Sequence, residues 1–324
     1  MPRPSQGLPG AARMLLAGLL IALLAGCSVQ IRPGTRPESE SQKQAVALAP
    51  KAQQRLDEAD DTLVQLVCVR TQEKIKDPQR FADPLERLSA ETVLADCPDK
   101  LARPFALALQ DAAMIEPRDR FQGLLDPSDP NAPLQRRGER IKVAVWTDAE
   151  SEQRYYADKQ GRTPPTRPVV WVTLVPEIQA WCRTALDWPD RSLATQAANA
   201  LRVNQRLGIP PGTIDSRFVE LWVPVEALLR SCADPDTHKL ACDLNPPASL
   251  NRPDLTDAAW FNWLVSTTNH SYRPAGAPWT RLGYTYDWGD GRAEPPYGAT
   301  EFVLAPSTTY EVADRRSLLD YCRK

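Results

Sequence analysis

Residues that could line a polar pocket gather in one stretch near the C-terminal end of the chain. His270, Arg281, Tyr284 and Asp287 lie within 18 positions of one another, and histidine is the side chain best suited to proton transfer near neutral pH. Along a strand, even spacing places side chains on one face, so Arg281 and Asp287 should share a face while Tyr284 points the other way. A structural alternative is an ion pair between Arg281 and Asp287, with His270 capping the last carbonyls of a preceding helix.

A second candidate follows directly after this stretch. Glu301 opens the segment Glu-Phe-Val-Leu-Ala-Pro at 301–306, which is followed by Thr-Tyr-Glu-Val at 309–312. This pattern resembles the closing strand of ADP-ribosyltransferases. The resemblance implies that Glu301 is a catalytic acid that binds the ribose of NAD. It covers about a dozen residues, and no matching Ser-Thr-Ser strand is found upstream.

Other familiar chemical signatures are missing from the sequence. It has no Gly-x-Ser-x-Gly, no phosphate-binding Gly-x-x-x-x-Gly-Lys-Ser/Thr and no His-Glu-x-x-His. The absence of any Cys-x-x-Cys, together with only two histidines, argues against a metal site, and no cofactor is expected. The net charge of −2 argues against binding nucleic acid through a broad positive field.

The N-terminal residues indicate export and a lipid anchor. Residues 14–25 are apolar apart from Gly18, follow two arginines without an acid, and end in Leu-Ala-Gly-Cys at 24–27. A dozen apolar residues are too few to cross a bilayer, which takes about 20, but they suit a secretory signal. The last four residues resemble the lipobox of bacterial lipoproteins. The resemblance implies cleavage after residue 26, acylation of Cys27 and, because Ser28 follows, sorting to the outer membrane. The alternative is an ordinary signal peptide or an uncleaved hydrophobic N-terminus.

The remaining cysteines fit an oxidising compartment. Six follow Cys27, an even number typical of a disulfide framework in an exported protein. Sequence alone permits 15 pairings. Proximity in the chain favours Cys68 with Cys97 and Cys232 with Cys242, and Cys182 with Cys322 would then hold the C-terminus.

Hydrophobic periodicity predicts a helical part at residues 49–125. After a polar tether at 27–48, apolar residues recur at helical spacing from Pro50 to Lys76. Further helices are expected at 84–96 and 105–115, with prolines between them. The polar, Pro-rich segment 126–140 reads as a loop and a boundary.

Strand patterns begin after this boundary. Residues 141–146 alternate between two faces, and 169–175 form a continuous apolar run expected to be covered on both sides. Each of the strands at 169–175 and 218–223 is followed by a proline and an expected short helix ending at a cysteine. Helices are also expected at 194–207 and 257–267, and strands at 280–286, 300–304 and 310–312.

Together these patterns predict an α+β fold, in which a helical N-terminal portion precedes a mixed β-sheet with short helices over residues 139–324. Residues 49–125 either fold alone or join that domain. We expect an outer-membrane-anchored envelope lipoprotein, facing the periplasm or the cell surface, that acts as a binding or interaction module for an unidentified envelope protein or ligand. The alternative is an envelope or surface enzyme with its site in residues 270–301. A deep polar pocket holding His270, Arg281 and Glu301 together would favour the enzyme.

Overall fold

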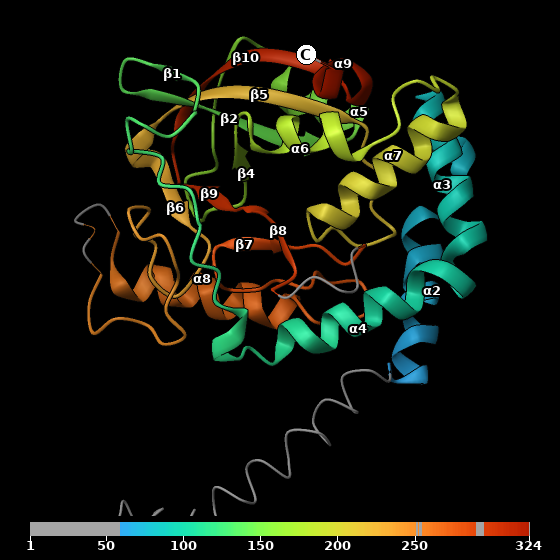
Figure 1. Cartoon of the computed structure of the whole chain (residues 1–324), viewed down its shortest axis with the longest axis horizontal. Coiled ribbons are helices and arrows are strands. Elements are labelled where there is room, and N and C mark those ends of the chain that lie inside the picture. The colour runs from blue at the N-terminus through green and yellow to red at the C-terminus, as the bar shows by residue number, and fades with distance from the viewer. Residues whose placement is uncertain (1–58, 251, 253–254, 290–294, 324) are drawn as a thin grey trace, which may run out of the picture. The chain divides into compact units, whose positions relative to one another are not determined.

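Polar caps determine where the N-terminal helices begin. The computed structural model describes residues 59–250, 252, 255–289 and 295–323 (Figure 1). The expected signal peptide, Cys27 and the tether lie outside these residues. Helix α2 (Asp61–Ile75) starts where the Asp60 carboxylate accepts the backbone N–H of Thr62 at 2.7 Å; the predicted helix start at Pro50 lies outside the described residues. Asp83 caps α3 (Pro84–Asp96) in the same way.

A π-helical turn (Cys97–Leu101) joins α3 to α4 (Ala102–Ala113). Helix α4 begins about one turn before the third helix predicted at 105–115. The three helices enclose an apolar core that includes Val67, Val93, Phe105 and Leu109. Ile214 and Trp288, from the second half of the chain, belong to the same core. The described residues from Ala59 onward belong to one compact unit, in which the helical portion packs with the rest of the chain.

The main sheet is antiparallel in every described pairing, where a mixed sheet was expected. Its strand order is β3-β10-β5-β2-β4-β9-β6, with β1 paired to β2. The strands are β1 (Arg136–Arg137), β2 (Arg140–Thr147), β3 (Gln160–Arg162), β4 (Trp171–Leu174), β5 (Arg217–Pro224), β6 (Leu228–Arg230), β9 (Phe302–Leu304) and β10 (Thr309–Ser317). Strands β7 (Tyr284–Tyr286) and β8 (Tyr297–Thr300) form a separate pair.

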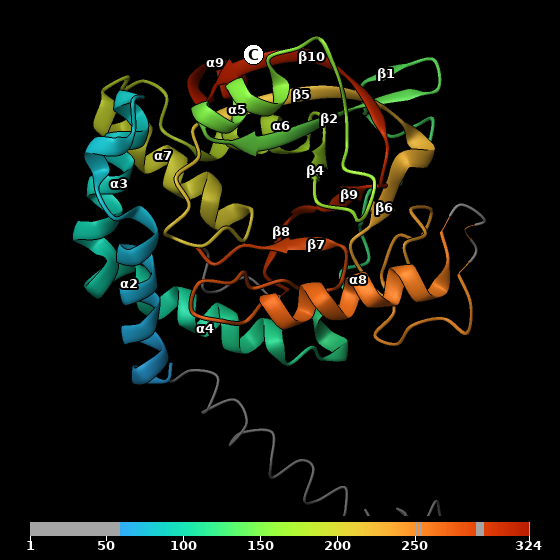
Figure 2. The ribbon, with the colours of Figure 1, turned by 180° about the vertical axis from the view of Figure 1, so that it is seen from behind.

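The predicted alternation of β2 holds. Ile141, Val143 and Val145 pack on one face with apolar residues of β5 and β9. Ala144, on the opposite face, packs with Phe218 and with helices α6 (Glu177–Ala185), α7 (Leu193–Arg206) and α9 (Leu318–Arg323). Helix α5 (Ala149–Tyr156) follows β2, and α8 (Asp257–His270) lies with α4 beyond β7 and β8 from the main sheet (Figures 1 and 2).

Two sequence predictions fail in the C-terminal third of the chain. The short helix expected after Pro224 is a 3₁₀ turn followed by strand β6, because Leu228–Arg230 pair with β9 and are fully buried. The expected strand 280–286 is reduced to β7, because Arg281 (φ 56°) and Gly283 (φ 76°) adopt left-handed backbone conformations that interrupt a ladder. Part of the expected Gly-Asp-Gly turn at 289–291 lies outside the described residues.

The three expected disulfides are present. Cys68–Cys97 joins α2 to the end of α3, Cys182–Cys322 joins α6 to α9 near the C-terminus, and Cys232–Cys242 closes a ten-residue interval. Within the described part of the chain, no helix is both long and apolar enough to cross a membrane.

Candidate functional site

The predicted cluster between residues 270 and 287 does not assemble into a site. The Arg281 guanidinium donates to the carbonyls of Ala112 (3.3 Å) and Ala113 (3.0 Å), and so caps the C-terminal end of α4. The Tyr284 hydroxyl donates to the carbonyl of Asp119 at 2.7 Å, within a buried cluster. These two side chains are structural.

Asp287 does not pair with Arg281, contrary to the sequence-based alternative. Both of its carboxylate oxygens accept hydrogen bonds at 2.8 Å from Arg202, and Arg206 adds a third at 3.2 Å. Asp287 is fully buried, and both arginines come from α7. Its role is to join α7 to the end of β7.

His270 ends α8 with the capping interaction expected from the sequence. Its Nδ1 lies 2.6 Å from the carbonyl of Ser266. Because a carbonyl only accepts, Nδ1 carries the proton of this bond. His270 nevertheless lies at the edge of a cavity, which it shares with Glu301 and not with Arg281.

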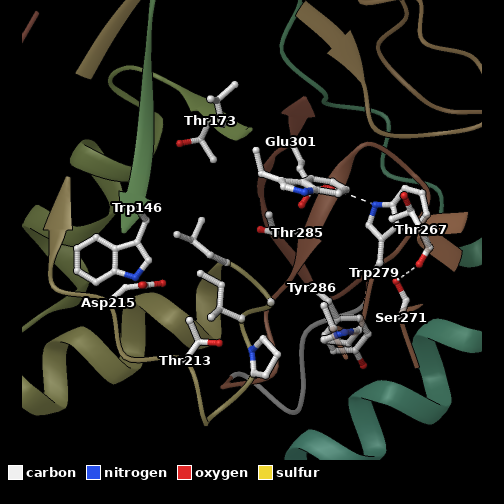
Figure 3. Close-up of a pocket in the computed structure, with 18 of the residues that line it drawn as sticks. Trp146, Thr173, Thr213, Asp215, Thr267, Ser271, Trp279, Thr285, Tyr286 and Glu301 are labelled. Carbon is white, nitrogen blue, oxygen red and sulfur yellow. Dashed lines mark hydrogen bonds between the residues drawn. The ribbon is translucent and has the colours of Figure 1, made fainter. Parts of the chain in front are cut away.

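This cavity has a volume of about 420 Å³ and lies where β2, β4, β5, β7, the α7–β5 loop and the end of α8 meet. One wall is formed by Trp146 and Phe218, whose rings are 4.5 Å apart. Trp171 and Trp279 form another wall, with rings 5.8 Å apart in an edge-to-face arrangement. Tyr286 also lines the space (Figure 3).

The aromatic walls are held rigidly from behind. The Trp146 indole N–H donates to Asn204 at 2.6 Å, and the Tyr286 hydroxyl donates to Asp111 at 2.9 Å. Trp279 packs edge-on against Trp263 of α8, whose own N–H donates to the carbonyl of Pro168. The cavity is therefore preformed, as small-molecule sites generally are.

Gly208 brings the α7–β5 loop close to β7. It has a left-handed backbone (φ 67°) just after α7, and a Cβ atom there would lie 3.2 Å from the Tyr286 carbonyl oxygen. The end of the helix predicted at 194–207 is thus also the point where the loop turns along the cavity, bringing Thr213 and Asp215 to its wall.

Asp215 is the most unusual polar residue of the lining. It is 7% exposed, and its carboxyl group has no hydrogen-bond partner among the described residues. Burial raises the pKa of this carboxyl to about 8; the negative charge of Asp148 acts in the same direction, and the positive charge of Lys74 opposes it. The Lys74 amino group instead donates to the Thr213 hydroxyl at 2.5 Å.

Glu301 lies across the cavity, next to Trp279 (Figure 3). One carboxylate oxygen accepts the Ser231 hydroxyl at 2.6 Å and the Trp279 indole N–H at 3.2 Å. Burial raises the pKa of Glu301 to about 7, although both hydrogen bonds favour the charged form. Two carboxyl groups with pKa values near neutrality therefore line one aromatic cavity.

Of the sequence candidates, His270 and Glu301 lie at this cavity, whereas Arg281, Tyr284 and Asp287 serve the scaffold. The sequence reasoning missed Asp215, Trp146 and Trp171 as lining residues. No motif marks them, because they come from segments that only the sheet brings together. Among the described residues, no group of three or more His, Cys, Asp or Glu side chains is placed to hold a metal ion.

Comparisons with protein-family models, with curated proteins and with solved structures find no match for this chain.

Proposed function

We propose that this chain is a cell-envelope lipoprotein, anchored in the outer membrane through acylated Cys27, whose folded unit binds a small, largely apolar ligand. The observation that carries the binding function is the preformed aromatic cavity of about 420 Å³. Its volume lies within the range of small-molecule sites, and its walls combine aromatic rings with a few polar groups, the usual composition of such sites.

The anchor is supported by the sequence of residues 14–27 and by the three disulfides, which suit an oxidising envelope compartment. Intact mass of the protein extracted from membranes tests it. We expect an acylated chain beginning at Cys27, and an unprocessed precursor from a Cys27→Ser variant. A wild-type chain that begins elsewhere, or carries no acyl group, would contradict the anchor.

Binding is tested with N-phenyl-1-naphthylamine, an uncharged aromatic probe that fluoresces in apolar sites. We expect saturable binding to the mature protein. Ala277→Trp adds a bulky ring at the cavity lining and should weaken binding about tenfold or more, as for the loss of most of an apolar contact surface. Ala180→Trp, on the exposed face of α6, adds the same ring elsewhere and should leave binding unchanged. Equal binding by both variants would exclude the cavity as the site.

An enzyme remains the second candidate, because Asp215 and Glu301 have pKa values suited to proton transfer near neutral pH and line the same space. The ADP-ribosyltransferase resemblance gains no support from the lining. Among the described lining residues none is Lys or Arg, so the cavity offers no such cation to a pyrophosphate group. Release of nicotinamide from NAD by the wild type, and not by Glu301→Gln, would revive that reading.

A further inference from the structure

The lining of the aromatic cavity is selective in charge as well as in shape. It contains two carboxyl groups, Asp215 and Glu301, and neither Lys nor Arg among its described members. An anionic ligand would have to approach these carboxyls without a compensating arginine or lysine. A neutral apolar ligand would leave the unpartnered Asp215 carboxyl in contact with apolar atoms, which is unfavourable.

We infer that the ligand is an organic ammonium ion, whose charged nitrogen lies against Asp215 and the Trp146 ring while its apolar body fills the space between the aromatic walls. This inference rests on the proposed binding function and names its ligand class.

Asp215 carries the argument because its carboxyl group accepts no hydrogen bond from a described residue, and the positive charge of Lys74 acts on it only without such a bond. The residue is 7% exposed, and the Lys74 amino group donates its hydrogen bond to Thr213 and not to Asp215. A buried carboxylate is stable only when it is paired or hydrogen-bonded. A bound ammonium ion supplies both, with its own N–H donors.

The aromatic rings favour the same ligand. Ring faces attract cations, and desolvated sites strengthen this attraction. In Figure 3 the Asp215 carboxyl lies beside the Trp146 indole, on the side of the cavity opposite Glu301 and Trp279. A cation at Asp215 therefore lies near a ring, and the second aromatic wall is left for the apolar part of the ligand.

Three probes with the same body test the inference: 2-phenylethylammonium, 2-phenylethanol and phenylacetate, which differ in charge. Titration calorimetry with the mature protein at about pH 8.5 should show the ammonium ion binding about tenfold or more tighter than the alcohol, as for a gained charged hydrogen bond. Phenylacetate should bind weakest. Asp215→Asn preserves the size of the side chain and should remove the preference for the cation, while Asp158→Asn, on the exposed surface, should retain it.

The pH dependence provides a test without any variant. Asp215 faces Lys74 on α2, Glu86 on α3 and Asp148 before α5, and shares the cavity with Glu301 and His270. With a pKa of about 8, Asp215 must lose its proton to bind a cation. Affinity for the ammonium ion should therefore rise about tenfold or more between about pH 6 and pH 8.5, whereas affinity for the alcohol should not rise.

The outcomes separate the two proposals. Equal binding of the ammonium ion and the alcohol, or tightest binding of phenylacetate, overturns the ligand class and leaves the apolar cavity site intact. Absence of binding by all three probes and by N-phenyl-1-naphthylamine overturns the binding function itself.

Discussion

Two buried aspartates in this fold have opposite surroundings. Asp287 is held by Arg202 through both carboxylate oxygens and by Arg206 through one, so its charge is neutralised within the chain. Asp215 is nearly as buried but has no hydrogen-bond donor among the described residues, and it borders a cavity. One carboxyl group completes the structure, while the other lacks a partner.

The difference shows that residue type alone does not predict the surroundings of a side chain. Asp287 lies in a conspicuous polar and aromatic stretch, yet its surroundings are those of a structural ion pair. Asp215 lies in an inconspicuous loop after Gly212, yet burial without a partner raises its pKa to about 8. A strongly shifted pKa next to a cavity makes Asp215 a candidate functional residue on a physical ground.

The largest expected effect comes from removing the paired acid. Asp287→Ala leaves Arg202 and Arg206 partly buried without their shared carboxylate, and should lower the free energy of unfolding by about 3 kcal/mol, as for other broken buried ion pairs. Urea unfolding at neutral pH measures the change, with the exposed Asp158→Ala as control. A loss below about 1 kcal/mol would mean that the network contributes little, and the contrast with Asp215 would fail.

An intermediate effect is expected at Glu301, which is partnered but borders the cavity. Glu301→Ala leaves the Ser231 hydroxyl and the Trp279 indole N–H without their acceptor, at a cost of about 2 kcal/mol. Glu301→Gln keeps an acceptor oxygen and should cost under about 1 kcal/mol. Denaturant unfolding of both variants at about pH 6 compares them; equal losses would show that the hydrogen bonds do not account for the effect.

The effect of Asp215 on folding stability should depend on pH and not on lost contacts. Its folded-state pKa of about 8 is above the value of about 3.9 in an unfolded chain, so the folded state binds the extra proton between these values. Folding stability therefore falls as pH rises through this window, and levels off above about 8. Asp215→Asn should remove that decline, so that the variant becomes more stable than the wild type by about 1 kcal/mol or more at pH 8.

Thermal unfolding of both proteins across the range from about pH 5 to pH 8.5 provides the measurement. The difference in stability between Asp215→Asn and the wild type should increase steadily with pH and be smallest at about pH 5. A constant difference would show that Asp215 is ionised, or paired, in the folded protein.

The sequence predicts the periodic elements well because their signals are local. The helix at 84–96 has the predicted bounds, and the alternation over 141–146 assigns the correct residues to the two faces of β2. The pattern failed at 228–230, where pairing with β9 outweighs the helical appearance of the segment. It also failed at 280–283, where two left-handed residues end the strand.

The cavity could not be predicted in the same way. Trp146 and Asp215 come to one side of it only because β2 and β5 are neighbours in the sheet, and Trp279 reaches the other from the loop after α8. Glu301 was found because it begins an apolar segment that resembles a known strand. Burial beside a cavity without a hydrogen-bond donor, as at Asp215, is a property of the folded chain and has no sequence signature.

The surroundings of Glu177 are intermediate between those of Asp287 and Asp215, and a change next to it gives the smallest expected effect on stability. One carboxylate oxygen accepts the Tyr297 hydroxyl and the backbone N–H of Thr300, whereas the other is buried without a hydrogen-bond partner in the part of the chain that the structure describes. Burial raises the pKa of Glu177 to about 7, and the Tyr297 hydroxyl opposes this rise.

Tyr297→Phe removes that donor, so the pKa of Glu177 should rise further. Stability should fall by about 1 kcal/mol at about pH 8.5, where the charged form needs the donor, and by less at about pH 5.5. Chemical unfolding at the two pH values tests this; an equal loss at both would show that the contribution of the hydroxyl does not depend on the charge of Glu177.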